Sequence, residues 1–480
     1  MLRRGARRLA GWAPLPTAMP IVMQTLGVPI HLFGHGPDLE FEALGQLIQL
    51  AESGLADHFV AAMPCTEQGK GTSGGAVFAS KTLVAPHGAG GDIGCGMMAA
   101  PVDDLWADDL ARRGKFSEKA QQLRDAMTRI PAGPGTWVPE AFDAKRVLKD
   151  EDRSHWLSEF LAKNEQHVLN QIGTLGSGGH FMEVDHDENG RVWLLLHTGS
   201  RHIGSAISSH YDTLARTQMK NDGRFDLGTK REQSANSLRA DSFEGQAYLQ
   251  DMRWAVQFAR ANRENLMRGF EKAVFDIFGR EVNRDKIVHT HHNFCQLERC
   301  KFVDPKTGAN VEEDLYVHRK GATSATPGKL SLLPGSLATG ACVVRGKGLS
   351  TAWNSMPTGS GRTNSRTESF QYLKQEEFER SVAKVLCDCS EVLRDESPQA
   401  YNDLDKVLSW SRDLVDVVHR LHPLINVKGI SRESGTRLKM GEAKRDKTGA
   451  FRPRKSGQQT RVSLILADDR KKPKKKPVPY

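Results

Sequence analysis

Five stretches of the chain, four of which contain glycine, carry side chains of the types that bind divalent metal ions. They are GGDIGCGMM with Asp92 and Cys95, GGHF with His180, LLLHTGSRHIG with His197, HTHHNF with His289, His291 and His292, and MPCTEQGKG with Cys65, Glu67 and Lys70. Each stretch alone is weak evidence, because a lone buried cysteine usually behaves as a small hydrophobe. Together, the carboxylate, thiolate and imidazole donors fit Mn²⁺, Zn²⁺ or Fe²⁺ better than Mg²⁺. The pattern predicts a site for one or two such cations.

Three further segments are typical of loops that hold phosphate. HRKGATSATPGK contains Arg319 and Lys320, LLPGSLATG follows it, and TGSGRTNSR contains Arg362 and Arg366. Backbone amides in glycine-rich turns bind anions, and basic side chains add favourable charge. Ordinary surface loops are the alternative interpretation of each segment. None matches the P-loop pattern, which disfavours a Walker-type kinase or ATPase.

The elements that must position these residues alternate between helix and strand. RVWLLLHTGSR predicts a buried strand that delivers His197 at its end. Helical spacing covers residues 39–53, about 107–171, 249–278 and most of 370–421, whereas 314–336 is turn-rich with short strands. The alternation lacks the regular βαβ period of a doubly wound sheet. The fold class is therefore α/β of the mixed α+β kind, and not a Rossmann fold.

Charge divides the 480-residue chain into three parts. Residues 1–37 carry four arginines and no acid, residues 38–428 have a balance of −6, and residues 429–480 have a balance of +11. We therefore expect a basic N-terminal extension, a slightly acidic body over 38–428 that forms one large domain or two ordinary ones, and a basic, disordered tail. The extension resembles a transit peptide, or else translation starts at Met19 or Met23. The tail either attracts phosphates or is a solvated, disordered segment.

The cysteines and the hydropathy indicate the cellular setting. Seven scattered cysteines without paired C-x-x-C motifs argue against a disulfide framework and for a reducing compartment. No apolar run reaches about 18 residues, so no membrane span is expected. We expect a cytoplasmic protein, with organellar targeting by the N-terminal segment as the alternative.

The motifs occur in the order seen in the RtcB family of RNA ligases, which the chain resembles. GGDIGCGM, GTLGSGGHFMEV, HTGSRHIG, HHNFCQLE, RKGATSA with the later PGS, and GSGR carry the resemblance over residues 63–428. It implies one large α/β domain with a central metal cleft. It also implies joining of an RNA 3′-phosphate or 2′,3′-cyclic phosphate end to a 5′-hydroxyl end with GTP and Mn²⁺, in RNA repair or tRNA splicing. An accessory protein partner is a further possibility.

The same resemblance implies roles for individual residues. The metal ligands are Asp92, Cys95, His180, His197 and His292. The nucleotide-binding positions are Gly179, His180, Phe181, Met182, Glu183, His292, Asn293, Lys320, Pro334, Gly335, Ser336, Leu337, Ala341, Gly359, Ser360, Gly361 and Lys428. The glycines beside His180 let the backbone approach nucleotide and metal closely.

The chain departs from the family where the guanylylated histidine belongs. The family's HGAGR is TGSGR here, so Thr358 occupies the catalytic nucleophile's position. A threonine hydroxyl needs a base to attack, and losing a covalent nucleophile commonly costs on the order of 10⁴ to 10⁶ in rate. The family's GNHF asparagine is Gly179, and its PDVH aspartate and histidine are Cys65 and Glu67.

Three hypotheses about function follow. The first is RNA ligation by a modified route or another nucleophile, for which His318 is a weak candidate. The second is a metal-dependent hydrolase that opens RNA cyclic phosphates. The third is a catalytically inactive homologue that binds RNA ends.

Overall fold

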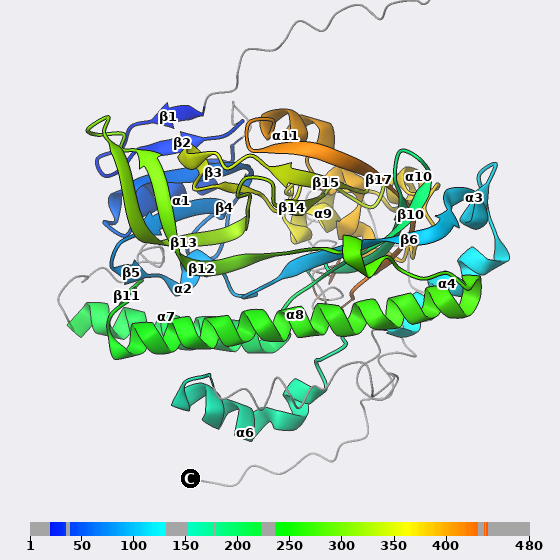
Figure 1. Ribbon diagram of the computed structural model, residues 1–480, viewed down its shortest axis with the longest axis horizontal. Coiled ribbons are helices and arrows are strands. Elements are labelled where there is room, and N and C mark those ends of the chain that lie inside the picture. The colour runs from blue at the N-terminus through cyan, green and yellow to red at the C-terminus, as the bar shows by residue number, and fades with distance from the viewer. Residues whose placement is uncertain are drawn as a thin grey trace, which may run out of the picture.

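One large mixed sheet organises the chain, and two long helices run along one of its faces (Figure 1). The computed structural model describes residues 20–34, 39–130, 152–176, 178–221 and 236–430, together with positions 436, 438 and 439. The first 19 residues and nearly all of the basic tail lie outside these ranges. No helix among the described residues is long and apolar enough to cross a membrane.

Thirteen strands of the described residues form this sheet. In spatial order they are β1 (Ile21–Met23), β2 (Ile30–Leu32), β3 (Asp57–Glu67), β4 (Gly74–Ser80), β13 (Asn310–Ser324), β12 (Val288–Val303), β6 (Gly96–Trp106), β10 (Arg191–Thr198), β9 (Phe181–His186), β17 (Val415–Lys428), β15 (Ala341–Gly346) and β14 (Leu330–Pro334), with β16 (Ser355–Pro357) paired to β13. All neighbours are antiparallel except β2 and β3. This pairing confirms the mixed class and is unlike the parallel sheet of a Rossmann fold.

Two short ribbons and the helices complete the described fold. The ribbons pair β5 (Leu83–Val84) with β11 (Leu238–Arg239), and β7 (Ala111–Arg112) with β8 (Lys115–Phe116). The helices are α1 (Phe41–Glu52), α2 (Pro86–Ala89), α3 (Ala107–Leu110), α4 (Glu118–Arg129), α6 (His155–Leu169), α7 (Arg201–Asn221), α8 (Phe243–Phe278), α9 (Arg366–Tyr372), α10 (Gln375–Ser381) and α11 (Leu404–Trp410). Single 3-10 turns are η3 (Arg284–Lys286), η4 (Ser350–Ala352), η5 (Glu391–Glu396) and η6 (Pro398–Ala400).

Helix α8 is the long support beneath the middle of the sheet (Figure 1). The Ser242 hydroxyl caps its N-terminus by accepting from the Gly245 amide, and Gly279 ends it in a left-handed conformation with φ 64°. Its buried side chains pack against α7 at one end and against β6 and β10 further along. The segment predicted as a helix over 249–278 is confirmed, and the helix begins earlier, at Phe243.

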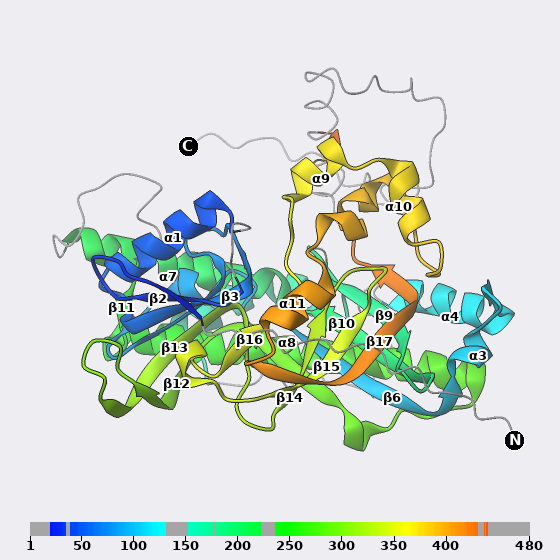
Figure 2. The same ribbon diagram turned by 90° about the horizontal axis from the view of Figure 1, so that it is seen from above.

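The C-terminal third contains the main differences from the sequence predictions. Residues 370–421 were expected to be mostly helical, but β17 starts at Val415 and runs for 14 residues. Residues 314–336 were expected to form short strands, but β13 is a 15-residue strand in a long hairpin with β12. Helices α9 and α10 project together from one edge of the molecule (Figure 2). The sheet itself starts upstream of residue 38, because β2 pairs with β3.

Strand β10 is the most buried of the strands that carry candidate ligands, and its core side chains set the stability of this region. Leu194 is fully buried between Ala100 of β6 and Val184 of β9. We expect Leu194→Ala to lower the free energy of unfolding by about 3 kcal/mol, because it removes buried apolar surface and leaves a cavity.

Chemical denaturation followed by tryptophan fluorescence measures this change. Leu297→Ala is the matched control, because the Leu297 side chain is 51% exposed, and its change should stay within about 0.5 kcal/mol. Equal losses for the two variants would contradict the assignment of β10 to the core.

Candidate metal and nucleotide site

Strand register brings four distant parts of the chain to one end of the sheet. Gly96 at the start of β6 pairs with Thr198 at the end of β10 and with His291 of β12. His197 of β10 pairs with Phe181 at the start of β9. Because antiparallel neighbours alternate in direction, these starts and ends coincide in space. The predicted ligands lie in or next to these positions.

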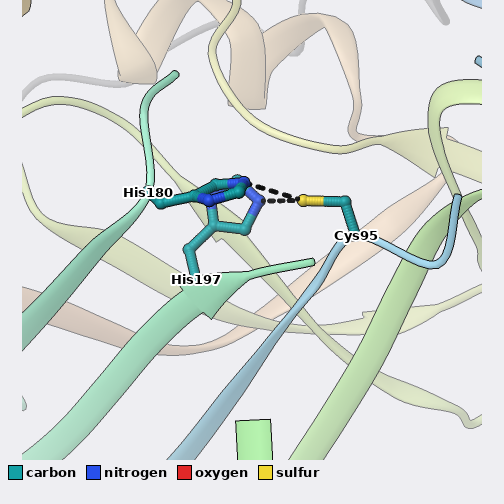
Figure 3. A group of neighbouring side chains, drawn as sticks. All are labelled: Cys95, His180 and His197. Atoms are coloured by element: carbon teal, nitrogen blue, oxygen red, sulfur yellow. Dashed lines mark hydrogen bonds between the residues drawn. The ribbon is translucent and has the colours of Figure 1, made fainter. Parts of the chain in front are cut away.

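The five predicted ligands converge. The Cys95 sulfur lies 3.3 Å from Nε2 of His180 and 3.3 Å from Nε2 of His197 (Figure 3). The two Nε2 atoms of His197 and His292 are 3.4 Å apart, and the Asp92 carboxylate is 3.2 Å from Nε2 of His180. Cys95, His180 and His292 are buried. Sulfur, nitrogen and oxygen donors thus face one another in a small volume.

Tight backbone turns make this approach possible. The Cys95 amide donates to the Asp92 carbonyl, and the His292 amide donates to the Cys95 carbonyl at 2.7 Å. Gly94 between them has φ +69°, and a β-carbon there would lie 2.7 Å from the Val256 backbone. A β-carbon on Gly199 would lie 2.3 Å from the Asp92 carboxylate. Glycine is therefore required by sterics at Gly94 and Gly199.

The protonation states suit a cation. His180 Nδ1 donates to the Leu175 carbonyl at 2.9 Å, which fixes the ring with Nε2 directed at Cys95 and Asp92. Burial, followed by the charge of Arg263, lowers the pKa of His292 to about 3, and burial lowers that of His197 well below its usual range. Both rings are therefore neutral, as metal-bound imidazoles are.

The pKa values of the Cys95 thiol and the Asp92 carboxyl are shifted in opposite directions. Burial and the Asp92 charge raise the pKa of the Cys95 thiol well above its usual range, so the sulfur keeps its proton until a cation displaces it. Burial alone raises the pKa of Asp92, yet hydrogen bonding to His180 brings it below its usual value. Such a mixed O, N and S donor set fits a borderline divalent cation.

Arg263 of α8 holds the backbone on which the ligands lie. Its guanidinium is fully buried and donates to the carbonyls of Gly94 and Thr198, each at 2.9 Å. It also donates from Nε to His289 Nε2 at 2.9 Å. His289 therefore binds an arginine and not the metal, which separates it from His292 in the HTHHNF stretch. Nothing in the local sequence around Arg263 signals this role.

Around the metal ligands, Phe181 and Lys428 form one wall. They pair in register between β9 and β17, and the Lys428 ammonium lies 4.9 Å from the centre of the Phe181 ring. Lys428 also pairs with Glu396 of η5 at 2.9 Å, and Tyr401 donates to the same carboxylate at 2.6 Å. Although burial alone lowers the pKa of Lys428, Glu396 raises it above its usual value. The ammonium therefore stays charged in a buried position.

Arg366 extends this ion-pair network. Its guanidinium contacts both Asp395, at 2.7 Å, and Glu396. Gly179 lies beside it, because a β-carbon at Gly179 would come within 3.3 Å of the Arg366 guanidinium. Gly179 has φ +92°, a conformation that favours glycine. The network therefore borders the backbone immediately before His180.

Glu183 and Asp185 are two buried acids on the same face of β9. Asn426 donates from Nδ2 to Glu183, while both oxygens of Asp185 lack a hydrogen-bond donor. Burial raises the pKa of both carboxyls, and Glu183 raises that of Asp185 further. Two buried carboxyls this close favour sharing a proton. Asp185 was not singled out from the sequence.

The glycine-rich loops expected to hold phosphate are bonded to one another. The Ser360 amide donates to the Pro334 carbonyl at 2.9 Å, and the Ser360 hydroxyl donates to the Gly335 carbonyl. Ser336 forms a turn with Thr339, through its amide donating to the threonine hydroxyl at 2.8 Å. These contacts bring the segments 334–341 and 358–361 together.

Two members of the predicted nucleotide set lie between the metal ligands and the loop after β3. Asn293, at φ 61°, donates to the Asp92 carbonyl and accepts from the Gly321 amide at 2.8 Å. Lys320 donates to the carbonyls of Lys70 and Thr72, and burial lowers its pKa to about 8. The remaining predicted positions carry no contact that assigns them to a nucleotide: Met182 and Ala341 are strand residues, and Leu337 packs in an apolar cluster with Leu393.

Thr358 lies near the metal ligands but in surroundings unlike those of an activated nucleophile. Its hydroxyl is 3.3 Å from the hydroxyl of Thr323, which pairs with His292 across β12 and β13. Cys65 packs against the same loop, since a β-carbon on Gly361 would lie 3.0 Å from that of Cys65. Burial raises the pKa of the Cys65 thiol to about 12. Neither neighbour is a base at neutral pH.

The other residues proposed from sequence have structural roles. His318 is fully buried, accepts from the Ala85 amide at 3.0 Å and donates to the Tyr316 carbonyl. Both ring nitrogens are therefore occupied, and His318 cannot replace the missing nucleophile. Glu67 accepts from the Arg362 amide and does not join the metal ligands.

Fold and site together place a His and Cys cluster that could hold a metal ion at the ends of strands in a mixed sheet. The family model described as tRNA-splicing ligase RtcB matches residues 46–429. The chain is 32% identical to the RNA-splicing ligase RtcB of Escherichia coli K12, over 85% of this chain and 99% of the relative. It is 29% identical to the RNA-splicing ligase RtcB of Mycobacterium tuberculosis, over 77% and 96%, and 28% identical to the tRNA-splicing ligase RtcB of Pyrobaculum aerophilum, over 76% and 87%. The chain belongs to the RtcB family.

Replacing the central sulfur tests the metal assignment. Cys95→Ala removes the donor that lies between two imidazoles, so affinity for Mn²⁺ should fall by more than about 100-fold. Titration of metal-free protein, followed by elemental analysis of the dialysed protein, measures it. Cys300→Ala is the control, because Cys300 is a buried cysteine in another cluster and should leave affinity unchanged. Equal affinity in both variants would remove Cys95 from the metal site.

Glu396 should contribute strongly to stability. Glu396→Gln leaves the buried Lys428 without its counter-charge, and should lower the free energy of unfolding by about 3 kcal/mol at pH 7. Although burial alone raises it, Lys428 and Arg366 hold the pKa of Glu396 well below 4.5, so this stabilisation is present above that pH and is lost as pH falls further.

Denaturant titrations at neutral and acidic pH check both parts of this prediction. Asp405→Asn is the control, because Asp405 is an exposed partner of Arg420 and its loss should cost less than about 1 kcal/mol. A difference that widens toward acidic pH would contradict the assigned sign.

Proposed function

We propose that this protein is an RNA ligase of the RtcB type, which joins RNA 3′-phosphate or 2′,3′-cyclic phosphate ends to 5′-hydroxyl ends with GTP and Mn²⁺. The convergence of Asp92, Cys95, His180, His197 and His292 at one end of the sheet carries the proposal. The relatives' names, RNA-splicing and tRNA-splicing ligase, support the reaction class.

The metal-binding part of the proposal rests on the donor set. Those five residues would hold one or two Mn²⁺ ions, which supply charge neutralisation at phosphate oxygens. Nε2 of His180 and Nε2 of His197 both lie against the Cys95 sulfur, and a bound cation would account for this arrangement. Arg263 and the Leu175 carbonyl fix the backbone and the His180 ring before any ion binds.

The nucleotide part rests on the wall next to the metal ligands. Phe181 offers a ring face, Lys428 a buried positive charge and Glu183 a buried carboxyl, all close in the register of β9 and β17. A guanine base has donors that suit a carboxylate and an oxygen acceptor that suits an ammonium. The bonded loops 334–341 and 358–361 supply amides and hydroxyls for phosphates.

Thr358 changes the route by which GMP reaches the RNA. Because the neutral Thr323 hydroxyl is the hydrogen-bond partner of its hydroxyl among the described residues, and the Cys65 thiol nearby is protonated, we propose direct transfer. An oxygen of the RNA 3′-phosphate attacks the α-phosphorus of GTP, the bond to the β-phosphate oxygen breaks, and pyrophosphate leaves. The RNA 5′-hydroxyl oxygen then attacks the terminal RNA phosphorus, GMP leaves, and the hydroxyl proton passes to solvent.

Thr358 also supports a second candidate function. If no GMP transfer takes place, the metal ligands still suit a hydrolase that opens RNA cyclic phosphates to 3′-phosphates with water. Thr358 favours this candidate, because hydrolysis needs no covalent nucleotide carrier. The catalytically inactive RNA-end binder is the third outcome.

One assay separates these functions. RNA with a cyclic phosphate and a 5′-hydroxyl is incubated with the protein, Mn²⁺ and α-³²P-GTP, and the denatured protein and RNA are analysed separately. Direct transfer predicts label on the RNA 3′ end, joined RNA and no acid-labile label on protein. Thr358→Ala should change the joining rate by less than about tenfold, whereas Cys95→Ala should lower it by more than about 100-fold.

The other outcomes are equally distinct. Acid-labile label on protein would show a replacement histidine and overturn direct transfer. Opened ends without joined RNA would establish the hydrolase, and RNA binding without turnover would establish the inactive homologue.

A further inference from the structure

Two cysteines outside the metal site lie close together in one loop. Cys387 and Cys389 flank Asp388 between α10 and η5, and their sulfurs are 3.8 Å apart. Both are partly exposed, whereas the other five cysteines, Cys65, Cys95, Cys295, Cys300 and Cys342, are buried. The pair is therefore the accessible thiol site of the described residues.

The loop holds the two sulfurs toward one another. The Asp388 carboxylate accepts from the amide and the hydroxyl of Ser390, at 2.9 and 3.1 Å, so this side chain turns toward η5. Gln375 of α10 donates to the Cys389 carbonyl at 2.6 Å. These bonds hold the Asp388 side chain and the Cys389 backbone in place. The two sulfurs are hydrogen-bond partners of each other.

The two thiols are chemically unequal. Hydrogen bonding from Cys387 lowers the pKa of Cys389, whereas hydrogen bonding to Cys389, with burial, raises the pKa of Cys387. A thiolate stabilised by a neighbouring thiol is the nucleophilic partner of such a pair.

We propose that Cys387 and Cys389 are a modification site, at which a peroxide oxidises the two thiols to an intramolecular disulfide. The Cys389 thiolate attacks the peroxide oxygen, the O–O bond breaks, and sulfenic acid and water form. The Cys387 sulfur then attacks the sulfenic sulfur, and a second water leaves. In total, two thiols and one hydrogen peroxide give one disulfide and two waters, and a thiol reductant reverses the change.

The disulfide would act on the ion-pair network because the loop connects β17, which carries Lys428, with η5, which carries Glu396. On one side, the Leu386 amide donates to the Leu424 carbonyl at 2.9 Å, and the Asn426 amide donates to the Leu386 carbonyl. On the other side, the chain enters η5, which ends at Glu396, the partner of Lys428. Drawing the sulfurs from 3.8 Å to the covalent distance of about 2.05 Å shifts this connection. The oxidation involves these two thiols alone and does not depend on the proposed ligase activity.

Differential alkylation of the full-length protein tests the proposal. After peroxide treatment, free thiols are blocked with N-ethylmaleimide, the protein is reduced, and newly exposed thiols are labelled with iodoacetamide. Trypsin releases residues 385–394 as one peptide that contains both cysteines and no other. We expect both to carry the second label, while Cys95 and Cys300 carry the first once the protein is unfolded.

A single-cysteine variant tests the chemistry. In Cys387→Ser the sulfenic acid on Cys389 has no partner, so dimedone should trap it in the variant and not in the unchanged protein. Two outcomes would overturn the proposal: both cysteines keep the first label at a peroxide dose that labels Cys389 in the variant, or the thiols pair between different chains.

Discussion

The structure depends on the register of four antiparallel strands. Strands β12, β6, β10 and β9 are neighbours, and their hydrogen-bond ladder places Gly96, His197, Phe181 and His291 in adjacent rows. A shift of one residue in any strand would turn its ligand to the opposite face of the sheet. The metal site is therefore a property of the whole ladder, and the buried apolar residues that fix the ladder are as necessary to it as the ligands.

Buried or partly buried charged side chains lie around the site, and Glu396 pairs with two of them. Arg263 supports the backbone of the metal ligands from below, while Glu396 joins Lys428 and Arg366 at the opposite wall. Such pairs gain little net stability, but they hold fixed charges at fixed positions in a region of low dielectric. The charge that a phosphorylated nucleotide or an RNA end meets is thus set before it binds.

The candidate metal-binding residues could be singled out from the sequence because each belongs to a short local pattern. Glycines flank Asp92, Cys95 and His180, and a run of apolar residues leads to His197. Among the three histidines of HTHHNF the residues alone left the choice open, and the structure removes His289, which binds Arg263. The mixed fold class was predictable for a related reason, since the elements lack a βαβ period.

The ion-pair wall was harder to predict because it depends on pairing between distant segments. Strand β17 contains histidines, arginine and proline, and this composition hides its alternation, so the segment was interpreted as helix up to Leu421. Asp185, Asn426 and Glu396 acquire their surroundings only when β9, β17 and η5 meet. Their local sequences resemble those of ordinary surface residues.

The irregularity in β17 between Pro423 and Ile425 sets which way the end of the strand faces. Residues before this irregularity pair with β9 in one register, and Asn426 and Lys428 pair with β9 in a register shifted by one residue. The extra residue of β17 sets the register in which the end of the strand pairs with β9. The length of this strand is therefore constrained more tightly than its composition. A one-residue deletion there would leave the lysine on the wrong side of the sheet.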